Sequence, residues 1–186
     1  MRGRVQVRDG FAVLLAALWC MDQTGVLPLF LLAAAVHEAG HLLILHLSGG
    51  RLHRLVLTSC GAVLHCALPA DRFACAAVCL AGPAASFALT AAAGAAGAWR
   101  LAGASALLGL FNLLPMPPLD GGMALSHLCG GRFGTARRGL ALLSAAGLVL
   151  GGLWVQQAGG GIWLLLIGAA MSVKSCKGLA NGIYMV

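Results

Sequence analysis

The stretch "AAAVHEAGHLLILHL", Ala33–Leu47, places three histidines and a glutamate in a run that is otherwise as apolar as a membrane span. Such polar side chains are costly in a bilayer, so their presence there calls for a function. His37 and His41 are four residues apart, about 400° of helical rotation, and therefore project from one face of a helix. Two imidazoles so placed can bind one Zn²⁺, and Glu38 beside them can reach a water on that metal. The other interpretation is a buried polar network between helices.

The composition indicates a polytopic membrane protein with a single domain, residues 1–186. The chain is 60% hydrophobic and only 9% charged, whereas a soluble domain carries about 25% charged residues. The apolar residues extend over the whole length, so a cleaved signal peptide does not account for them. The net charge of +7 lies mainly between apolar segments, which indicates loops that set membrane orientation rather than nucleic-acid binding. The cysteines at 20, 75 and 79 lie in apolar stretches and are interpreted as small buried hydrophobes.

Six apolar segments predict six membrane-spanning helices, at residues 11–21, 26–47, 73–97, 101–116, 140–155 and 162–173. Several are shorter than the roughly 20 residues that a span requires. With six crossings and both termini inside, eleven of the 12 lysines and arginines fall on the cytoplasmic side and only Arg100 lies outside. The positive-inside rule favours this topology. The fold class expected is therefore an all-α polytopic membrane protein.

A short segment between the second and third spans differs from the rest. "RLVLTSCGAVLH", Arg54–His65, has β-branched and apolar residues around a central glycine. This pattern predicts a β-hairpin or ribbon over about residues 51–66 on the cytoplasmic face. The linker has no room for an inserted soluble domain.

A third metal ligand is expected, because catalytic zinc takes three protein ligands and keeps one position open. Glu38 is the only glutamate in the chain, and His46 lies about 180° from His37 around the helix. Among the aspartates, Asp120 in "FNLLPMPPLDGG" (residues 111–122) follows the fourth span on the cytoplasmic side. His41 lies six residues before the end of the second span, about 9 Å below it. The two can meet if these helices are neighbours; the alternative is a loop that only ends a helix.

The backbone around Asp120 is expected to be irregular. Pro115, Pro117 and Pro118 break the helix. Broken backbone at membrane depth is tolerated where protein buries it or where it lines a wet cavity. Gly121 and Gly122 allow an unusual turn or a close approach.

Together these motifs resemble the site-2 protease family of intramembrane zinc metalloproteases. "HEAGH" matches the first family motif, "NLLPMPPLDG" matches the second, and "LAGPAASF" (residues 80–87) resembles the Gly-Pro segment on the intervening helix. The resemblance covers roughly residues 5–175. Within the family, the compact layout is closest to the sporulation factor IVFB group, which processes a sigma-factor precursor in spore-forming bacteria.

The resemblance implies a three-helix catalytic core that holds one Zn²⁺ per chain. His37, His41 and Asp120 would be the metal ligands and Glu38 the catalytic acid and base. Asn112 would be a polar group near the substrate backbone or oxyanion. The ribbon would guide an extended substrate by edge pairing. Structural support would come from Gly82, Pro83, Pro115 and Gly121.

The chain departs from the family pattern in several places. Ser86 stands where family members often have Asn, and "TSCGA" (residues 58–62) stands where the sporulation group tends to have Pro-Phe-Gly-Gly. No PDZ insert and no C-terminal CBS domain are expected.

The function expected is therefore that of an intramembrane zinc metalloendopeptidase. Its expected partner is a membrane-protein substrate such as a transcription-factor or sigma-factor precursor, and no nucleic acid is expected. The enzyme would lie in a bacterial cell membrane or an internal spore-associated membrane, with its site near the cytoplasmic leaflet. The sequence leaves open whether regulatory membrane proteins bind the enzyme and whether it forms homo-oligomers. Competing interpretations are a zinc-binding membrane transporter and a non-catalytic membrane scaffold.

Overall fold

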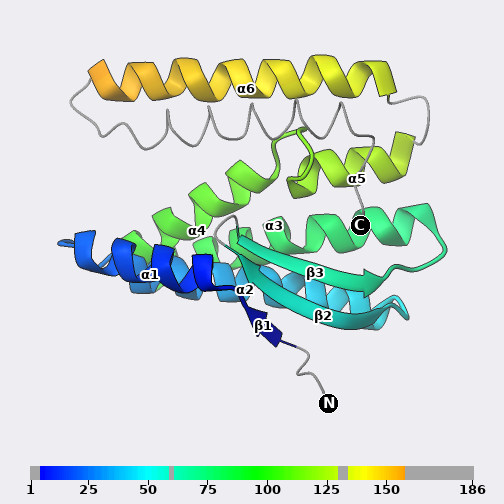
Figure 1. Cartoon of the computed structure of the whole chain (residues 1–186), viewed down its shortest axis with the longest axis horizontal. Helices are drawn as coiled ribbons and strands as arrows, with labels where there is room; N and C mark the ends of the chain where they lie inside the picture. Colours follow the sequence, from blue (N-terminus) through cyan, green and yellow to red (C-terminus); the bar gives the residue numbers. More distant parts are fainter. Residues whose placement is uncertain (1–4, 59–60, 130–133, 158–186) are drawn as a thin grey trace. The chain divides into compact units, whose positions relative to one another are not determined.

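A computed structural model of the chain describes residues 5–58, 61–129 and 134–157 (Figure 1). The described part is mostly helical and carries one small three-stranded sheet. The chain divides into two compact units, the first running to Asn112 and the second beginning at Leu113. Each unit is described by itself.

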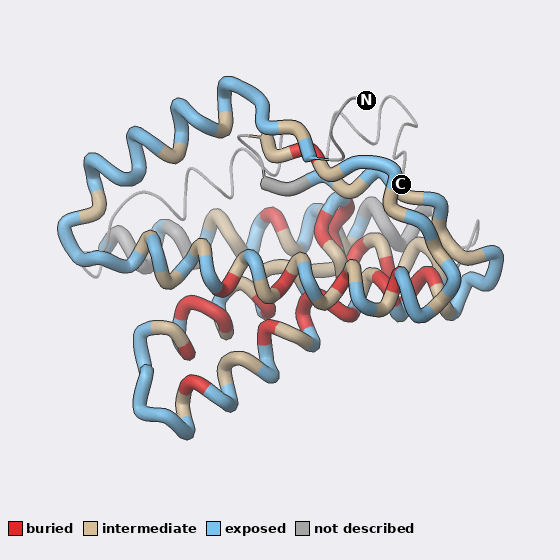
Figure 2. The backbone as a smooth tube through the Cα atoms, turned by 90° about the horizontal axis from the view of Figure 1, so that it is seen from below, coloured by how far each residue is buried: buried red, intermediate tan, exposed pale blue. Residues whose placement is uncertain are grey.

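The first unit is built on three helices that pack against one another: α2 (Leu27–Leu47), α3 (Arg72–Ala95) and α4 (Trp99–Asn112). The buried residues of α2 recur at every fourth position, from Ala33 to Leu45 (Figure 2). Packing is close because small residues meet at the contact: a Cβ added at Gly40 of α2 would lie 2.6 Å from the carbonyl oxygen of Ala81 on α3. A fourth helix, α1 (Asp9–Met21), has no buried residue.

Polar side chains fix where the helices of this unit begin. The Asp71 carboxylate accepts a hydrogen bond from the backbone N–H of Ala74 (3.0 Å) and caps α3. Before α2, the Asp22 carboxylate accepts from the backbone N–H groups of Val26 (3.1 Å) and Leu27 (2.9 Å). The hydrogen bond from Leu27 contributes most to holding the pKa of Asp22 below its ordinary value. Both carboxylates satisfy N–H groups that have no partner within a helix.

The sheet contains the predicted ribbon together with a strand that was not predicted. Strands β2 (Arg51–Thr58) and β3 (Gly61–Ala67) pair antiparallel, as expected for residues 51–66. Strand β1 (Val5–Val7) adds to β2 in parallel, with Val5 opposite Leu55, so the order is β1-β2-β3. A three-residue strand gives no periodic signal in the sequence.

The second unit contains α5 (Asp120–Cys129) and α6 (Gly134–Gln157). The sequence predicted no helix at α5, and it extended the fourth span to residue 116. In the structure α4 ends at Asn112, because the prolines that follow cannot continue a helix. The predicted segment at 162–173 lies outside the described residues.

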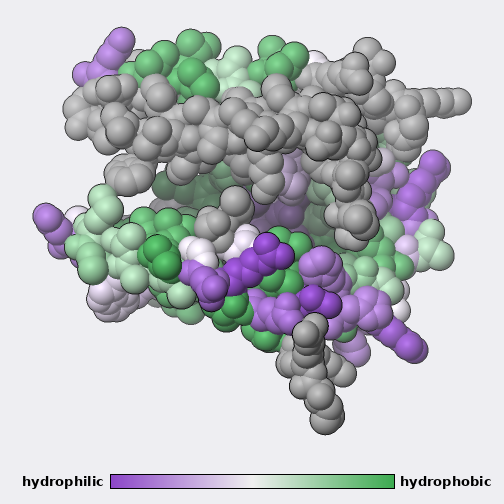
Figure 3. Space-filling model, viewed as in Figure 1, coloured by the Kyte–Doolittle hydropathy of each residue, from purple (hydrophilic) through white to green (hydrophobic). Residues whose placement is uncertain are grey.

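Two described helices are long and apolar enough to cross a membrane, α2 with 21 residues and α3 with 24. At 13 and 14 residues, α1 and α4 are shorter than the roughly 20 residues of a full span. Six crossings therefore stay a prediction. On the face shown in Figure 3, hydrophilic side chains gather over β2 and β3. Large apolar side chains are exposed on the helices, among them Val13, Trp19, Phe30 and Leu43, as expected of a surface that meets lipid. Cys20 is also exposed and Cys79 is half-buried, so the prediction of buried cysteines holds only for Cys75.

Candidate metal centre

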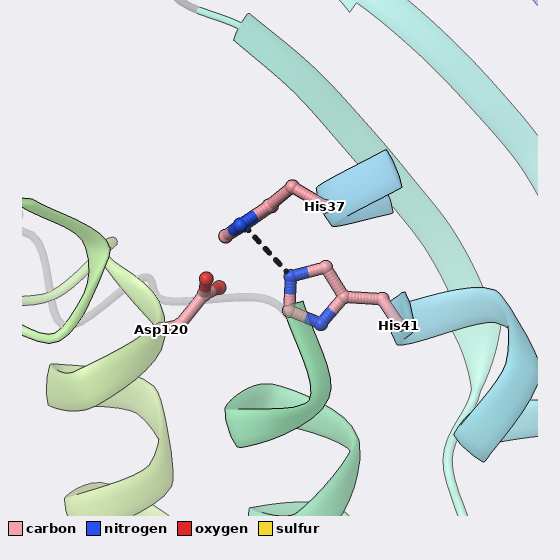
Figure 4. A group of neighbouring side chains, drawn as sticks. All are labelled: His37, His41 and Asp120. Carbon is pink, nitrogen blue, oxygen red and sulfur yellow. Dashed lines mark hydrogen bonds between the residues drawn. The ribbon is translucent and has the colours of Figure 1, made fainter. Parts of the chain in front are cut away.

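The two histidines of α2 form a buried pair. Only 4% of His37 and 6% of His41 is exposed. Their Nε2 atoms lie 3.2 Å apart, and their rings meet edge to face (Figure 4). The i, i+4 spacing on α2 therefore brings two imidazole nitrogens to one point, as the sequence predicted.

Helix α3 holds the opposite nitrogen of each ring. His41 donates its Nδ1–H to the backbone carbonyl of Val78 (2.7 Å), and Nδ1 of His37 lies 2.9 Å from the Ser86 hydroxyl. A carbonyl can only accept, so Nδ1 of His41 carries the proton and its Nε2 presents a lone pair. Anchoring of the distal nitrogen in this manner is the usual support of a metal-binding histidine.

Gly82 of α3 leaves space between these two anchors. A Cβ added at Gly82 would lie 2.7 Å from Nε2 of His37 and would collide with Nε2 of His41. Val78, Gly82 and Ser86 are four residues apart and share one face of α3, and all three are buried. A side chain at position 82 would fill the space in front of both nitrogens, so glycine is required there.

The residues fit a zinc ion. Two nitrogens bound to one tetrahedral zinc at 2.0–2.1 Å would be about 3.3 Å apart, close to the 3.2 Å observed. Imidazole nitrogens with a carboxylate form a donor set that suits zinc. The space beside Gly82 lies within reach of both nitrogens.

Asp120 is the first residue of α5, and glycines shape the turn that precedes it. A Cβ at Gly121 would collide with the carbonyl of Leu113, and one at Gly122 would lie 2.6 Å from Cδ of Pro117. These two glycines therefore let the proline-rich loop fold against the start of its own helix. Asp120 belongs to the second unit and the two histidines to the first, so Asp120 as the third ligand stays a prediction.

The other residues singled out in the sequence lie as follows. Glu38 is half-buried on α2, and His46 is exposed near the end of that helix. The Asn112 side chain donates to the carbonyl of Leu108 in its own helix (3.0 Å). Pro83 is fully buried inside α3, and Pro115 is half-buried.

The sequence did not identify the side-chain partner of His37. Ser86 was noted only as a departure from a family pattern, yet it is fully buried and its hydroxyl contacts His37. Its position four residues after Gly82 was the signal that could have placed it on the same helix face.

Comparison with known proteins finds a similar fold. No protein-family model and no curated protein matches the chain. The described fold is similar to a solved structure of a site-2 protease from Methanocaldococcus jannaschii, with a TM-score of 0.69 and 18% sequence identity. The match covers 98% of this chain and 93% of that one. At this identity the likeness establishes the fold, which is that of a site-2 protease.

Proposed function

We propose that this protein is an intramembrane zinc metalloprotease that hydrolyses a peptide bond in or near the membrane segment of a membrane-associated protein. The observation that carries the proposal is the buried pair of Nε2 atoms, 3.2 Å apart, in front of Gly82. The fold likeness to a site-2 protease supports it. A transporter or a scaffold gains no support from these observations.

In this proposal His37, His41 and Asp120 hold one Zn²⁺. Imidazole nitrogens together with a carboxylate form a donor set that suits zinc. When bound, the metal would supply Lewis-acid polarisation of the scissile carbonyl and would make water a stronger acid. Val78 and Ser86 would keep the imidazoles oriented for that task.

Glu38 is the proposed acid and base. Its position directly after His37 on α2 and its half-buried state support a role in taking a proton from the attacking water and passing it to the leaving amine. Asn112 is the proposed oxyanion donor. One N–H of its amide is used by the carbonyl of Leu108, and an amide carries a second N–H for the substrate.

The proposed placement is a bacterial membrane, crossed six times, with both termini and the site on the cytoplasmic side. The lengths of α2 and α3 and the distribution of arginine and lysine support it. The proposed substrate is a membrane-associated precursor of a transcription or sigma factor. The β-sheet would receive it as an extended strand, since β1 and β3 are the outer strands.

The test replaces Glu38 by glutamine in cells that produce this protein. We expect a membrane-associated precursor to accumulate uncleaved in the E38Q strain and its cytoplasmic fragment to disappear, as measured by mass spectrometry of membrane and soluble fractions. Purified E38Q should keep its zinc, because Glu38 is not a ligand in this proposal. Identical fragments in both strains would remove Glu38 from catalysis.

His46→Gln is the matched control. His46 lies on the same helix but is exposed, so this variant should cleave at the wild-type rate. A loss of cleavage in H46Q equal to that in E38Q would indicate damage to α2 rather than to catalysis.

A further inference from the structure

The two residues of α3 that anchor the histidine pair differ in chemistry: Val78 offers a backbone carbonyl and Ser86 offers a hydroxyl. We propose that Ser86 is a positioning residue that selects the tautomer of His37 and thereby sets the metal affinity of the site. This inference rests on the proposed function. The Ser86 hydroxyl lies 2.9 Å from Nδ1 of His37, and the residue has no exposed surface.

The two histidines are anchored unequally. The Val78 carbonyl only accepts, so it commits His41 to one tautomer, with the lone pair on Nε2. The Ser86 hydroxyl can donate or accept, so it serves either tautomer of His37. The protonation pattern of the pair therefore depends on which way the Ser86 hydroxyl points.

The two orientations correspond to two states of the site. When Ser86 donates to Nδ1, the proton of His37 is on Nε2 and can be donated to Nε2 of His41, 3.2 Å away; Figure 4 draws this contact as a dashed line. When Ser86 accepts from Nδ1–H, both Nε2 atoms present lone pairs toward the space beside Gly82, which is the form a metal requires. One hydroxyl thus stabilises both the metal-free and the metal-binding arrangement.

The position of Ser86 is itself fixed by its neighbours. Its backbone carbonyl accepts from the hydroxyl of Ser105 on α4 (2.8 Å) and from that of Thr90 on the next turn of α3 (2.9 Å). A Cβ added at Gly109 of α4 would lie only 3.1 Å from Cβ of Ser86, so α4 packs directly against this position. The Ser86 side chain therefore has little room to move away from His37.

Substitution by alanine tests this role. Ser86→Ala removes the hydroxyl and leaves His37 without this anchor in a buried setting. Removing an outer-shell partner of a metal-binding histidine typically weakens metal affinity about 10–100-fold. We expect a loss in that range for S86A, measured on purified protein by competition between the site and a chromogenic zinc chelator. The visible absorption of the Co²⁺-substituted protein should also shift, because the orientation of one imidazole changes.

Ser105→Ala is the matched control. Ser105 is also a serine with no exposed surface and a hydrogen bond to the same segment of α3, but it contacts the Ser86 carbonyl and not the histidine. S105A should keep the wild-type zinc affinity and Co²⁺ spectrum, because the Thr90 hydroxyl still donates to the Ser86 carbonyl and the Ser86 hydroxyl is unchanged. Ser86→Cys, similar in size with a weaker hydrogen-bonding group, should fall between S86A and the wild type, and it serves as the test if S86A does not fold.

The outcomes separate this inference from the proposed function. A zinc affinity of S86A within twofold of the wild type, or an equal loss in S105A, would overturn the role of Ser86 while leaving the metalloprotease proposal intact. A wild-type protein that binds no zinc would overturn the proposed function itself.

Discussion

The candidate metal centre depends on a residue without a side chain. Gly82 leaves open the space in front of both Nε2 atoms, and any larger residue would occupy it. The sequence marks this position only as the first residue of a Gly-Pro pair. Its role follows from the approach of α3 to α2, which no local pattern encodes.

We predict that Gly82→Ala abolishes zinc binding. The added methyl group would collide with Nε2 of His41 and displace the ring from the position that a metal needs. The zinc content of the purified variant, measured by atomic absorption, should fall from about one ion per chain to none. Gly103→Ala is the control, because nothing lies within 4 Å of a Cβ at that helix position. One zinc per chain in G82A would contradict this view of the site.

We predict that Asp120→Ala lowers zinc affinity without unfolding α2 or α3. The carboxylate is the proposed third ligand, and its loss leaves two imidazoles that bind zinc more weakly. Chelator competition on the purified variant measures the loss. Asp9→Ala, which removes an exposed carboxylate at the start of α1, should bind zinc as the wild type does. Full zinc retention in D120A would remove Asp120 from the ligand set.

At the scale of the helices, the geometry of the candidate site depends on the contact between α2 and α3, because α3 carries both anchors of the histidines. Gly40→Val would push a branched side chain against the Ala81 carbonyl and the Ala85 Cβ, which lie 2.6 and 2.7 Å from a Cβ at this position. We expect a destabilisation of about 1–3 kcal/mol, seen as a lower Tm in detergent. Gly103→Ala should instead keep or raise the Tm, since alanine favours helix by about 1 kcal/mol. An unchanged Tm in G40V would show that these helices are not held this closely.

The start of α2 supplies a pH-dependent contribution to stability. Asp22 accepts backbone hydrogen bonds as a carboxylate, and its pKa is lowered from the ordinary value of 3.8. A lowered folded-state pKa gives stability that is fully present above the unfolded pKa and lost as the pH falls through the folded one. We therefore expect Asp22→Ala to have a lower Tm than the wild type at pH 7, and the two Tm values to converge below pH 3.8. A difference in Tm that is constant with pH would contradict this account.

At the scale of the whole molecule, the fold of the first unit restricts which loops can lie on the same side of the membrane. The Arg100 side chain donates to the Thr24 carbonyl, so the segment before α2 and the segment after α3 lie at the same end of the first unit. The proposed topology of six crossings would put that end outside the cytoplasm. Reporter fusions check this: a reporter after Ala98 should be active only outside, and one after Asp71 only inside. The reverse pattern would invert the proposed orientation.

Much of the site could be predicted because its main signal is local. The spacing of His37 and His41 requires only the geometry of one helix. Asp120 was predicted as the third ligand partly by exclusion, since few carboxylates exist in the chain. Strand β1 and helix α5 were missed because short elements take their stability from tertiary contacts rather than from a periodic pattern.

The amino-acid sequence alone establishes an apolar, helical chain with two histidines on one face of a helix, because composition and the 3.6-residue period act locally. Only the tertiary structure decides what holds that face in place. The Val78 carbonyl, the gap at Gly82 and the Ser86 hydroxyl come from residues 37 to 49 positions away from the histidines they serve. Contacts over such distances depend on how α2 and α3 pack, and packing is a property of two surfaces together rather than of either sequence segment.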